Sequence, residues 1–146
     1  MNLSKDMKIS QAITVTNGAA GTDDINGVTL DMAGFEGVLM EITFGAITSG
    51  AVTSIKAQQD TDSAMGTAAD LLGTAQTIAD DDDEQTFYID LVKPAERYVR
   101  LVVDRGTQNA VVASATYIQY GAHVQPTTHG SNVSGETHIS PAEGTA

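Results

Sequence analysis

The chain of 146 residues contains no cysteine and no tryptophan, and only 3 of its residues are proline. Without a thiol it has no disulfide, no thiolate metal site and no cysteine nucleophile. Basic residues are also scarce, because 7 lysines and arginines stand against 19 aspartates and glutamates, for a formal net charge of -12. Binding to nucleic acid or to an anionic membrane surface needs clusters of lysine and arginine, so we expect neither partner.

Long apolar runs and catalytic signatures are absent as well. No window approaches the length of about 18 apolar residues that a membrane-spanning helix needs, and the stretch Met1–Lys8 lacks the apolar centre of a signal peptide. The chain has no phosphate-binding loop ending in Gly-Lys, no G-x-G-x-x-G, no G-x-S-x-G and no H-E-x-x-H. We therefore expect no enzymatic activity, no catalytic residue and no cofactor.

The potential metal ligands follow no known pattern. Three histidines lie in the C-terminal tail, at spacings that match no common ligand set: His123, His129 and His138. An Asp-x-Asp pair beginning at Asp60 resembles the start of a calcium loop, but Met65 stands where that loop needs glycine. The charge run Asp80–Glu84 is interpreted as a solvated acidic turn. We expect no metal site.

What the chain does contain is a series of short apolar runs in which side chains alternate. Apolar residues at every second position from Val38 to Phe44 share one face of a strand. Comparable runs occur at 9–16, 28–32, 35–47, 52–59, 75–79, 86–92, 97–104 and 109–120. About eight strands and no amphipathic helix predict an all-β protein, a β-sandwich, with a jelly roll favoured and an immunoglobulin-like topology second.

The strongest runs are the last three, from Thr86 to Gly121. Turn residues separate them, among them Pro94, which cannot donate to a sheet. We predict that these runs form a three-stranded antiparallel meander at the centre of one core, with Leu101 buried between Ile89 and the strand at 110–120. The final run has apolar residues at both odd-numbered and even-numbered positions, which predicts a strand covered on both faces.

The domain organisation is predicted to be simple. We expect one β-sandwich domain at 9–121, between a flexible N-terminal arm at 1–8 and an extended C-terminal arm at 122–146. The C-terminal arm has no lysine or arginine and few aliphatic residues, so it should be disordered on its own. Its sizeable aliphatic residues are candidate contacts for adding the arm to the sheet edge of another subunit: Val124, Val133 and Ile139.

Four basic residues fall close together in the last three runs: Lys93, Arg97, Arg100 and Arg105. One interpretation is a small basic patch that binds an acidic partner, with Arg97 and Arg100 as candidate assembly contacts. The other is a set of local ion pairs of the kind that contributes little to stability at a protein surface, with the expected carboxylates Glu96, Asp90 and Asp104.

The same region resembles a known family. Lys93–Arg100, Val103–Val111 and Ile118–Gly121, together with the closing Thr137–Ala146, are similar to small virion proteins of tailed bacteriophages. The resemblance covers residues 86–146. It implies a capsid decoration, or cement, protein with a jelly-roll sandwich on the outside of an HK97-type shell.

The resemblance also implies partners and a location. The partner would be the major capsid protein, the decoration protein would form a dimer or trimer, and it would reach the virion capsid surface after synthesis in the host cytoplasm. An acidic surface would keep it soluble at high copy number. The alternative is a receptor- or carbohydrate-binding β-sandwich of a phage fibre or head appendage, although only 4 tyrosines and no tryptophan are present. A glycan-acting enzyme has no support beyond abundant aspartate.

Overall fold

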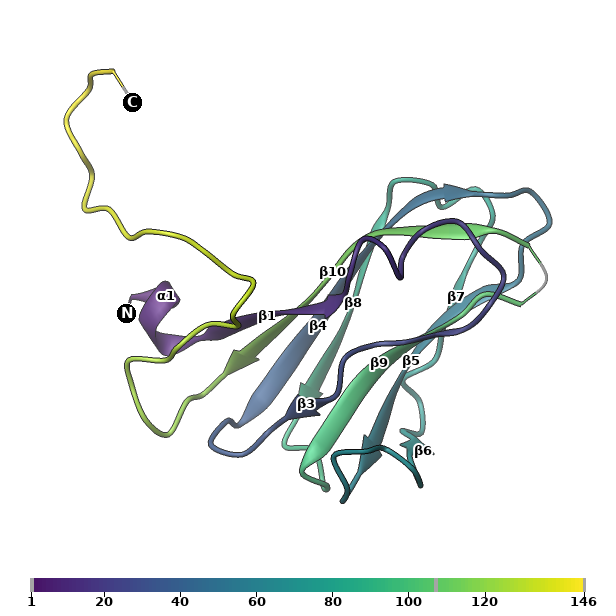
Figure 1. Ribbon diagram of the computed structural model, residues 1–146, viewed down its shortest axis with the longest axis horizontal. Coiled ribbons are helices and arrows are strands. Elements are labelled where there is room, and N and C mark those ends of the chain that lie inside the picture. Colours follow the sequence, from purple (N-terminus) through teal and green to yellow (C-terminus); the bar gives the residue numbers. More distant parts are fainter. Residues whose placement is uncertain (1, 107, 146) are drawn as a thin grey trace.

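A computed structural model describes residues 2–106 and 108–145 (Figure 1). The elements are α1 (Leu3–Asp6), β1 (Lys8–Ile13), β2 (Ile25–Asn26), β3 (Leu30–Asp31), β4 (Gly37–Ile47), β5 (Thr53–Asp60), β6 (Ala69–Asp70), β7 (Gln76–Ile78), β8 (Thr86–Val92), β9 (Tyr98–Asp104) and β10 (Ala110–Tyr120). The long strands fall on the runs that the sequence predicts. The short helix α1 lies where a flexible arm is predicted, and the two-residue strand β6 lies where the pattern left a helical turn or a loop open.

Strands from the two ends of the chain pair with each other, and strands from its middle pair among themselves. β1 pairs with β10, and both β2 and β3 pair with β9. β4 pairs with β8, and β5 pairs with β6 and β7; all of these pairings are antiparallel. Two further ladders, β4–β10 and β5–β9, join these pairs into a 4-stranded sheet ordered β1-β10-β4-β8 and a 6-stranded sheet built on β2-β9-β5-β6. We call them the β4 sheet and the β5 sheet. They pack face to face (Figure 1), which confirms the predicted all-β sandwich.

One apolar face of each long strand forms the core between the sheets. The alternating residues of β4, Val38 to Phe44, are fully buried, as are three alternating residues of β9. Leu101 is fully buried in the same cluster as Ile89, as the alternation predicts. Each such side chain contributes roughly 1.5–3 kcal/mol by leaving water.

The predicted meander of the last three strands is wrong. β8 and β10 both lie beside β4 in one sheet, and β9 lies between β2 and β5 in the other. The chain therefore crosses between the sheets after β8 and again after β9. Turn residues mark where the chain reverses, but they do not determine which sheet the next strand joins, because an apolar strand face is buried equally well in either sheet.

The last strand is also not covered on both faces. Its buried side chains stand at positions 110 and 112, and then at positions 115, 117 and 119. The buried positions change from even-numbered to odd-numbered residues at an irregularity in the pairing with β4, between Val112 and Ser114. Such a β-bulge places one extra residue in the strand. Apolar residues at even-numbered and odd-numbered positions therefore point into the same core, and the outer face of β10 stays partly exposed.

Tyr117 links the two sheets at the gap between β2 and β3. Its buried ring extends from β10, and its hydroxyl accepts a hydrogen bond from the N–H of Leu101 (2.9 Å) and donates one to the carbonyl of Val28 (2.9 Å). Burial raises the pKa of Tyr117, so the hydroxyl keeps the proton that it donates. Gly27 is needed beside it, because a Cβ there would lie 2.7 Å from the carbonyl oxygen of Leu101 and 2.8 Å from the Tyr117 hydroxyl.

Candidate assembly surface

Arg97, the first predicted contact, forms an ion pair with a carboxylate of its own chain. Its Nε and Nη2 donate to the two carboxylate oxygens of Asp31, at 2.9 and 2.8 Å, and its guanidinium carbon lies 5.2 Å from the centre of the Tyr98 ring. This contact lowers the pKa of Asp31 and raises that of Arg97. The side chains are 57% and 45% exposed, so the pair is screened by solvent and remains accessible to a partner.

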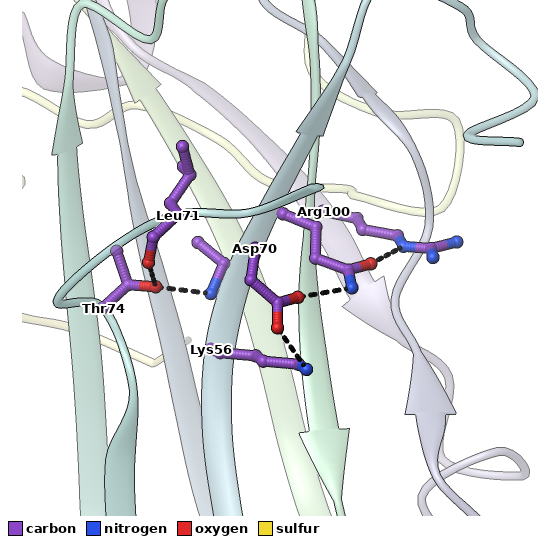
Figure 2. A network of polar contacts seen from close by, with 7 residues as sticks. Lys56, Asp70, Leu71, Thr74 and Arg100 are labelled. Atoms are coloured by element: carbon purple, nitrogen blue, oxygen red, sulfur yellow. Dashed lines mark hydrogen bonds and ion pairs between the residues drawn. The ribbon is translucent and has the colours of Figure 1, made fainter. Parts of the chain in front are cut away.

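Arg100, the second predicted contact, belongs to a polar network on the outer face of the β5 sheet (Figure 2). Its Nε donates to Oε1 of Gln58 (2.8 Å), Nε2 of Gln58 donates to Oδ1 of Asp70 (2.7 Å), and Nζ of Lys56 lies 2.7 Å from Oδ2 of Asp70. Hydrogen bonds from Lys56 and then Gln58 lower the pKa of Asp70. The network runs from β9 across β5 to β6 and holds that two-residue strand against the sheet.

Arg105 is a structural residue and not part of a surface patch. It is 5% exposed, and its guanidinium donates to the main-chain carbonyls of Asp23 (2.6 Å), Ala19 (2.7 Å) and Ala110 (3.1 Å). These bonds fix the loop between β1 and β2. Gly21 makes room for the guanidinium, since a Cβ at that position would lie 2.9 Å from Nη2.

The carboxylate partners expected from the sequence are wrong. Among the described residues, two of the four clustered basic residues form ion pairs, Lys93 with Glu36 and Arg97 with Asp31, and both carboxylates lie far away along the chain. Of the expected partners, Asp90 accepts the hydroxyl of Tyr120 at 2.6 Å, and Asp104 accepts the N–H of Gly106 at 3.2 Å. Burial, and then Asp90, raise the pKa of Tyr120 to about 12. Local sequence spacing could not identify these pairs, because strands that lie far apart in sequence bring the groups together.

A shallow hollow of about 400 Å³ lies at the end of the sandwich next to Arg97. It is lined by Met32, Ala33, Phe35, Glu36 and residues 93–97. On its rim, Glu36 lies 2.9 Å from Nε2 of His123 and 3.7 Å from Nζ of Lys93, and these neighbours, His123 first, lower the pKa of Glu36. Apolar and charged residues therefore line the same hollow, a mixture that is common at protein contacts.

The larger part of the C-terminal arm binds its own domain. The N–H of Thr127 donates to the carbonyl of Lys5, the N–H of Gly130 donates to the carbonyl of Ile9 (2.8 Å), and the N–H of Ile9 donates to Nδ1 of His129 (3.0 Å). β1 is the edge strand of the β4 sheet, so residues 122–137, which we call the strap, cover the start of that edge at Ile9. That the arm adds to the sheet edge of another subunit stays a prediction, and it now concerns the residues beyond the strap.

The three aliphatic candidates of the arm have different surroundings. Val133 is partly buried and lines, with Ile9 and His129, a groove of about 390 Å³ between the strap and the start of the chain. Val124 is 81% exposed and Ile139 is 95% exposed. The end of the arm extends away from the sandwich (Figure 1), so Ile139 is available to a partner.

Replacing His129 by alanine should loosen the strap locally, because the N–H of Ile9 loses its acceptor. A hydrogen bond worth about 0.5–1.5 kcal/mol corresponds to a roughly 2- to 10-fold faster amide exchange at Ile9. Exchange of the amides of β4 should not change. His138→Ala is the matched control, since His138 lies 3.2 Å from the carboxylate of exposed Glu136 and not beside β1. Equal exchange rates at Ile9 in the two variants would contradict the assignment.

The acidic run before β8 is more ordered than predicted. Asp80 accepts the N–H of Gly50 (2.6 Å) and Asp83 accepts the N–H of Ile47 (2.7 Å), so the run caps the loop between β4 and β5. Asp60 is similarly engaged, because the N–H groups of its own loop donate to its carboxylate and lower its pKa. Within residues 2–106 and 108–145 no group of three or more potential ligands could hold a metal, and no helix is long and apolar enough to cross a membrane.

These features define a class of fold, an antiparallel two-sheet β-sandwich whose first edge strand is covered by the C-terminal strap. A solved structure with a similar fold is the crystal structure of PBSX exported protein XepA, from a phage-like element. The match has a TM-score of 0.53 and 14% sequence identity, and it covers 96% of this chain but 45% of XepA. At this identity the likeness shows a shared fold, and it does not extend to the capsid decoration family. No protein-family model and no curated protein matches the chain.

The residues that hold the strap were missed by the sequence analysis. Thr127, His129 and Gly130 lie in a polar segment without periodicity, and they bond through main-chain groups, the hydroxyl of Thr127 and one imidazole nitrogen. The available signal was the uneven spread of histidines, all three of which lie after β10. It was weighed only as a metal-binding pattern, for which the spacing is wrong.

Proposed function

We propose that the protein is a non-enzymatic virion structural protein that decorates and stabilises the outer surface of an HK97-type capsid of a tailed phage. The observation that carries the proposal is the fold shared with XepA of the phage-like element PBSX over 96% of the chain. The resemblance of residues 86–146 to decoration proteins supports the finer role. The partner is then the major capsid protein, and the location is the capsid surface.

The strand order supports a jelly roll as the finer topology. With β2 and β3 counted as one strand, and β6 and β7 as another, one sheet holds the first, eighth, third and sixth strands and the other holds the second, seventh, fourth and fifth. First pairs with eighth, second with seventh, third with sixth and fourth with fifth, as two Greek keys rolled into a sandwich require. An immunoglobulin-like sandwich instead places its first strand beside its second.

The hollow beside Arg97 is the docking surface that this proposal favours. Its lining combines apolar residues, including Phe35 and Pro94, with the side chain of Arg97, which is 57% exposed. Arg100 is held within the face of the β5 sheet by Gln58 and serves the fold. A cement protein gains its function from surface contact with the shell, and such contacts concentrate on a few residues around an apolar centre.

The test is co-sedimentation with phage capsids from which the protein has been removed. We expect binding at a copy number that matches the capsid lattice, a loss of occupancy for Arg97→Glu, and unchanged occupancy for the matched variant Arg100→Glu. Absence of the protein from purified virions would refute the proposal. A few copies per particle would instead favour a receptor- or carbohydrate-binding appendage.

A further inference from the structure

In the part of the chain that the structure describes, no strand pairs with the outer side of β8, the second edge of the β4 sheet. β8 has 7 residues and pairs with β4 in a continuous register without a bulge. The other edges are protected, since the strap covers β1 and the outer strands of the β5 sheet are only 2 or 3 residues long. Short or covered edges are how β proteins avoid pairing with other chains. β8 departs from this rule.

The outward main-chain groups of β8 can be assigned residue by residue. The N–H of Lys93 donates to the carbonyl of Glu36, and the N–H of Phe44 donates to the carbonyl of Gln85, so odd-numbered residues of β8 face β4. Even-numbered residues, from 86 to 92, therefore present their N–H and C=O groups outward. Among the described residues the amide of Gln76, which donates to the carbonyl of Tyr88 (2.8 Å), is the one group bonded to this edge.

We propose that β8 pairs antiparallel with β8 of a second copy, which joins the two β4 sheets into one continuous sheet across a two-fold axis. In the register centred on Ile89, Tyr88 of each copy lies opposite Asp90 of the partner subunit, and Thr86 lies opposite Val92. The phenol and the carboxylate are complementary as donor and acceptor. Tyr88 and Val92 are 63% and 59% exposed in the single chain, and both would be covered.

The neighbouring registers are less favourable. A shift of the pairing by two residues in one direction sets Asp90 opposite Asp90 of the partner subunit, and like charges directly opposite each other destabilise a sheet. A shift in the other direction sets Tyr88 opposite Tyr88 and leaves the Asp90 carboxylates facing Thr86. The register centred on Ile89 avoids both arrangements and brings the partly buried Phe87 and Leu91 of the two copies together at the margin of the core.

Charge complementarity at the strand ends supports the same pairing. The acidic run Asp80–Glu84 precedes β8, and the turn that begins with Lys93 follows it. Antiparallel pairing places the acidic end of each copy beside the basic end of the other. Lys93 is 75% exposed, and its nitrogen is 3.7 Å from Glu36, so it has room for a second carboxylate. These contacts oppose the general repulsion between two chains of charge -12.

In the single chain, Gln76 partly occupies the position of the incoming strand. A hollow of about 390 Å³, lined by Gln76, Thr86, Phe87 and Tyr88, lies beside the edge. A second β8 would fill it and would displace the Gln76 amide from the carbonyl of Tyr88. Gln76→Ala removes this competitor, so the variant should dimerise more tightly than the unchanged chain.

The test compares two charges at one exposed position, by sedimentation equilibrium of the full chain. Tyr88→Asp sets the new carboxylate at position 88 opposite Asp90 of the partner subunit, and the two-fold axis repeats this repulsion. The substitution should weaken dimerisation by about tenfold or more. Tyr88→Lys faces Asp90 of the partner subunit instead and should keep the dimer. Melting curves at concentrations where both variants are monomeric should match the unchanged chain. A monomer at all concentrations, or equal effects of the two charges, would overturn the proposal.

A cysteine placed on the axis tests the register directly, because the chain has no other thiol. Residue 89 opposes itself at a position without hydrogen bonds between the strands, where Cα atoms lie about 4.5 Å apart, within disulfide range. Ile89→Cys should form a covalent dimer on mild oxidation, and Val92→Cys should not. No cross-link at 89 would refute the register. Loss of the dimer on removal of residues 138–146 would assign the edge to the arm of the second copy and overturn β8–β8 pairing.

Discussion

Replacing Leu101 by alanine is expected to lower the free energy of unfolding by roughly 2–5 kcal/mol. Leu101 has no exposed surface and lies in the central cluster between the two sheets. The substitution removes buried methyl groups and leaves a cavity, since strands paired on both sides of β9 cannot collapse into the space. The free energy is measured by urea unfolding, in which the midpoint should fall while the slope stays constant.

Leu72→Ala is the matched control for this substitution. Leu72 is fully exposed, with a relative surface of 103%, so its truncation should change stability by no more than about 0.5 kcal/mol. If both variants unfold at the midpoint of the unchanged chain, the assignment of β9 to the core between the sheets is wrong.

Replacing Arg105 by methionine should destabilise the fold by about 3 kcal/mol or more. The guanidinium donates to the carbonyls of Ala19, Asp23 and Ala110, and hydrogen bonds to charged groups contribute about 1.5–3 kcal/mol each. Methionine fills similar volume, but it leaves these carbonyls without their donor. The loop between β1 and β2 should then exchange its amide hydrogens faster than the rest of the sandwich.

The control for Arg105 is another arginine of the same cluster. Arg97→Met removes an exposed ion pair with Asp31, which should cost no more than about 1 kcal/mol, and less at high salt. The pKa of Asp31 should return upward toward its ordinary value, because the hydrogen bond from Arg97 is the main cause of its lowering. Comparable losses of stability for the two variants would show that Arg105 does not hold the loop.

The extent of the strands was largely predictable from the sequence. Alternation in Val38–Phe44 and in Val99–Val103 identified two core faces that the structure confirms, because alternation is a property of each strand alone. The bulge in β10 was not predictable, since an extra residue becomes visible only against the register of β4. The predicted pairing of the last three strands was wrong for the same reason, because their partners in β4 and β5 lie far earlier in the chain, as Asp60 of β5 does from Tyr98 of β9.

For the candidate assembly surface, too, some features were predictable from the sequence and others were not. The sequence showed a cluster of arginines and a polar arm with isolated aliphatic residues, and these observations do not depend on folding. Only the tertiary structure separated Arg105, buried among carbonyls, from Arg97 at an exposed rim. Likewise, only the tertiary structure placed the strap on β1 and left β8 open.

The sequence by itself thus determined that this chain is acidic, free of thiols and built of alternating strands, because composition and alternation are local properties. The tertiary structure decided which strands pair, which arginine is buried and which sheet edge remains free. Each of these outcomes depends on groups from distant parts of the chain competing for the same hydrogen-bond partners and the same buried space.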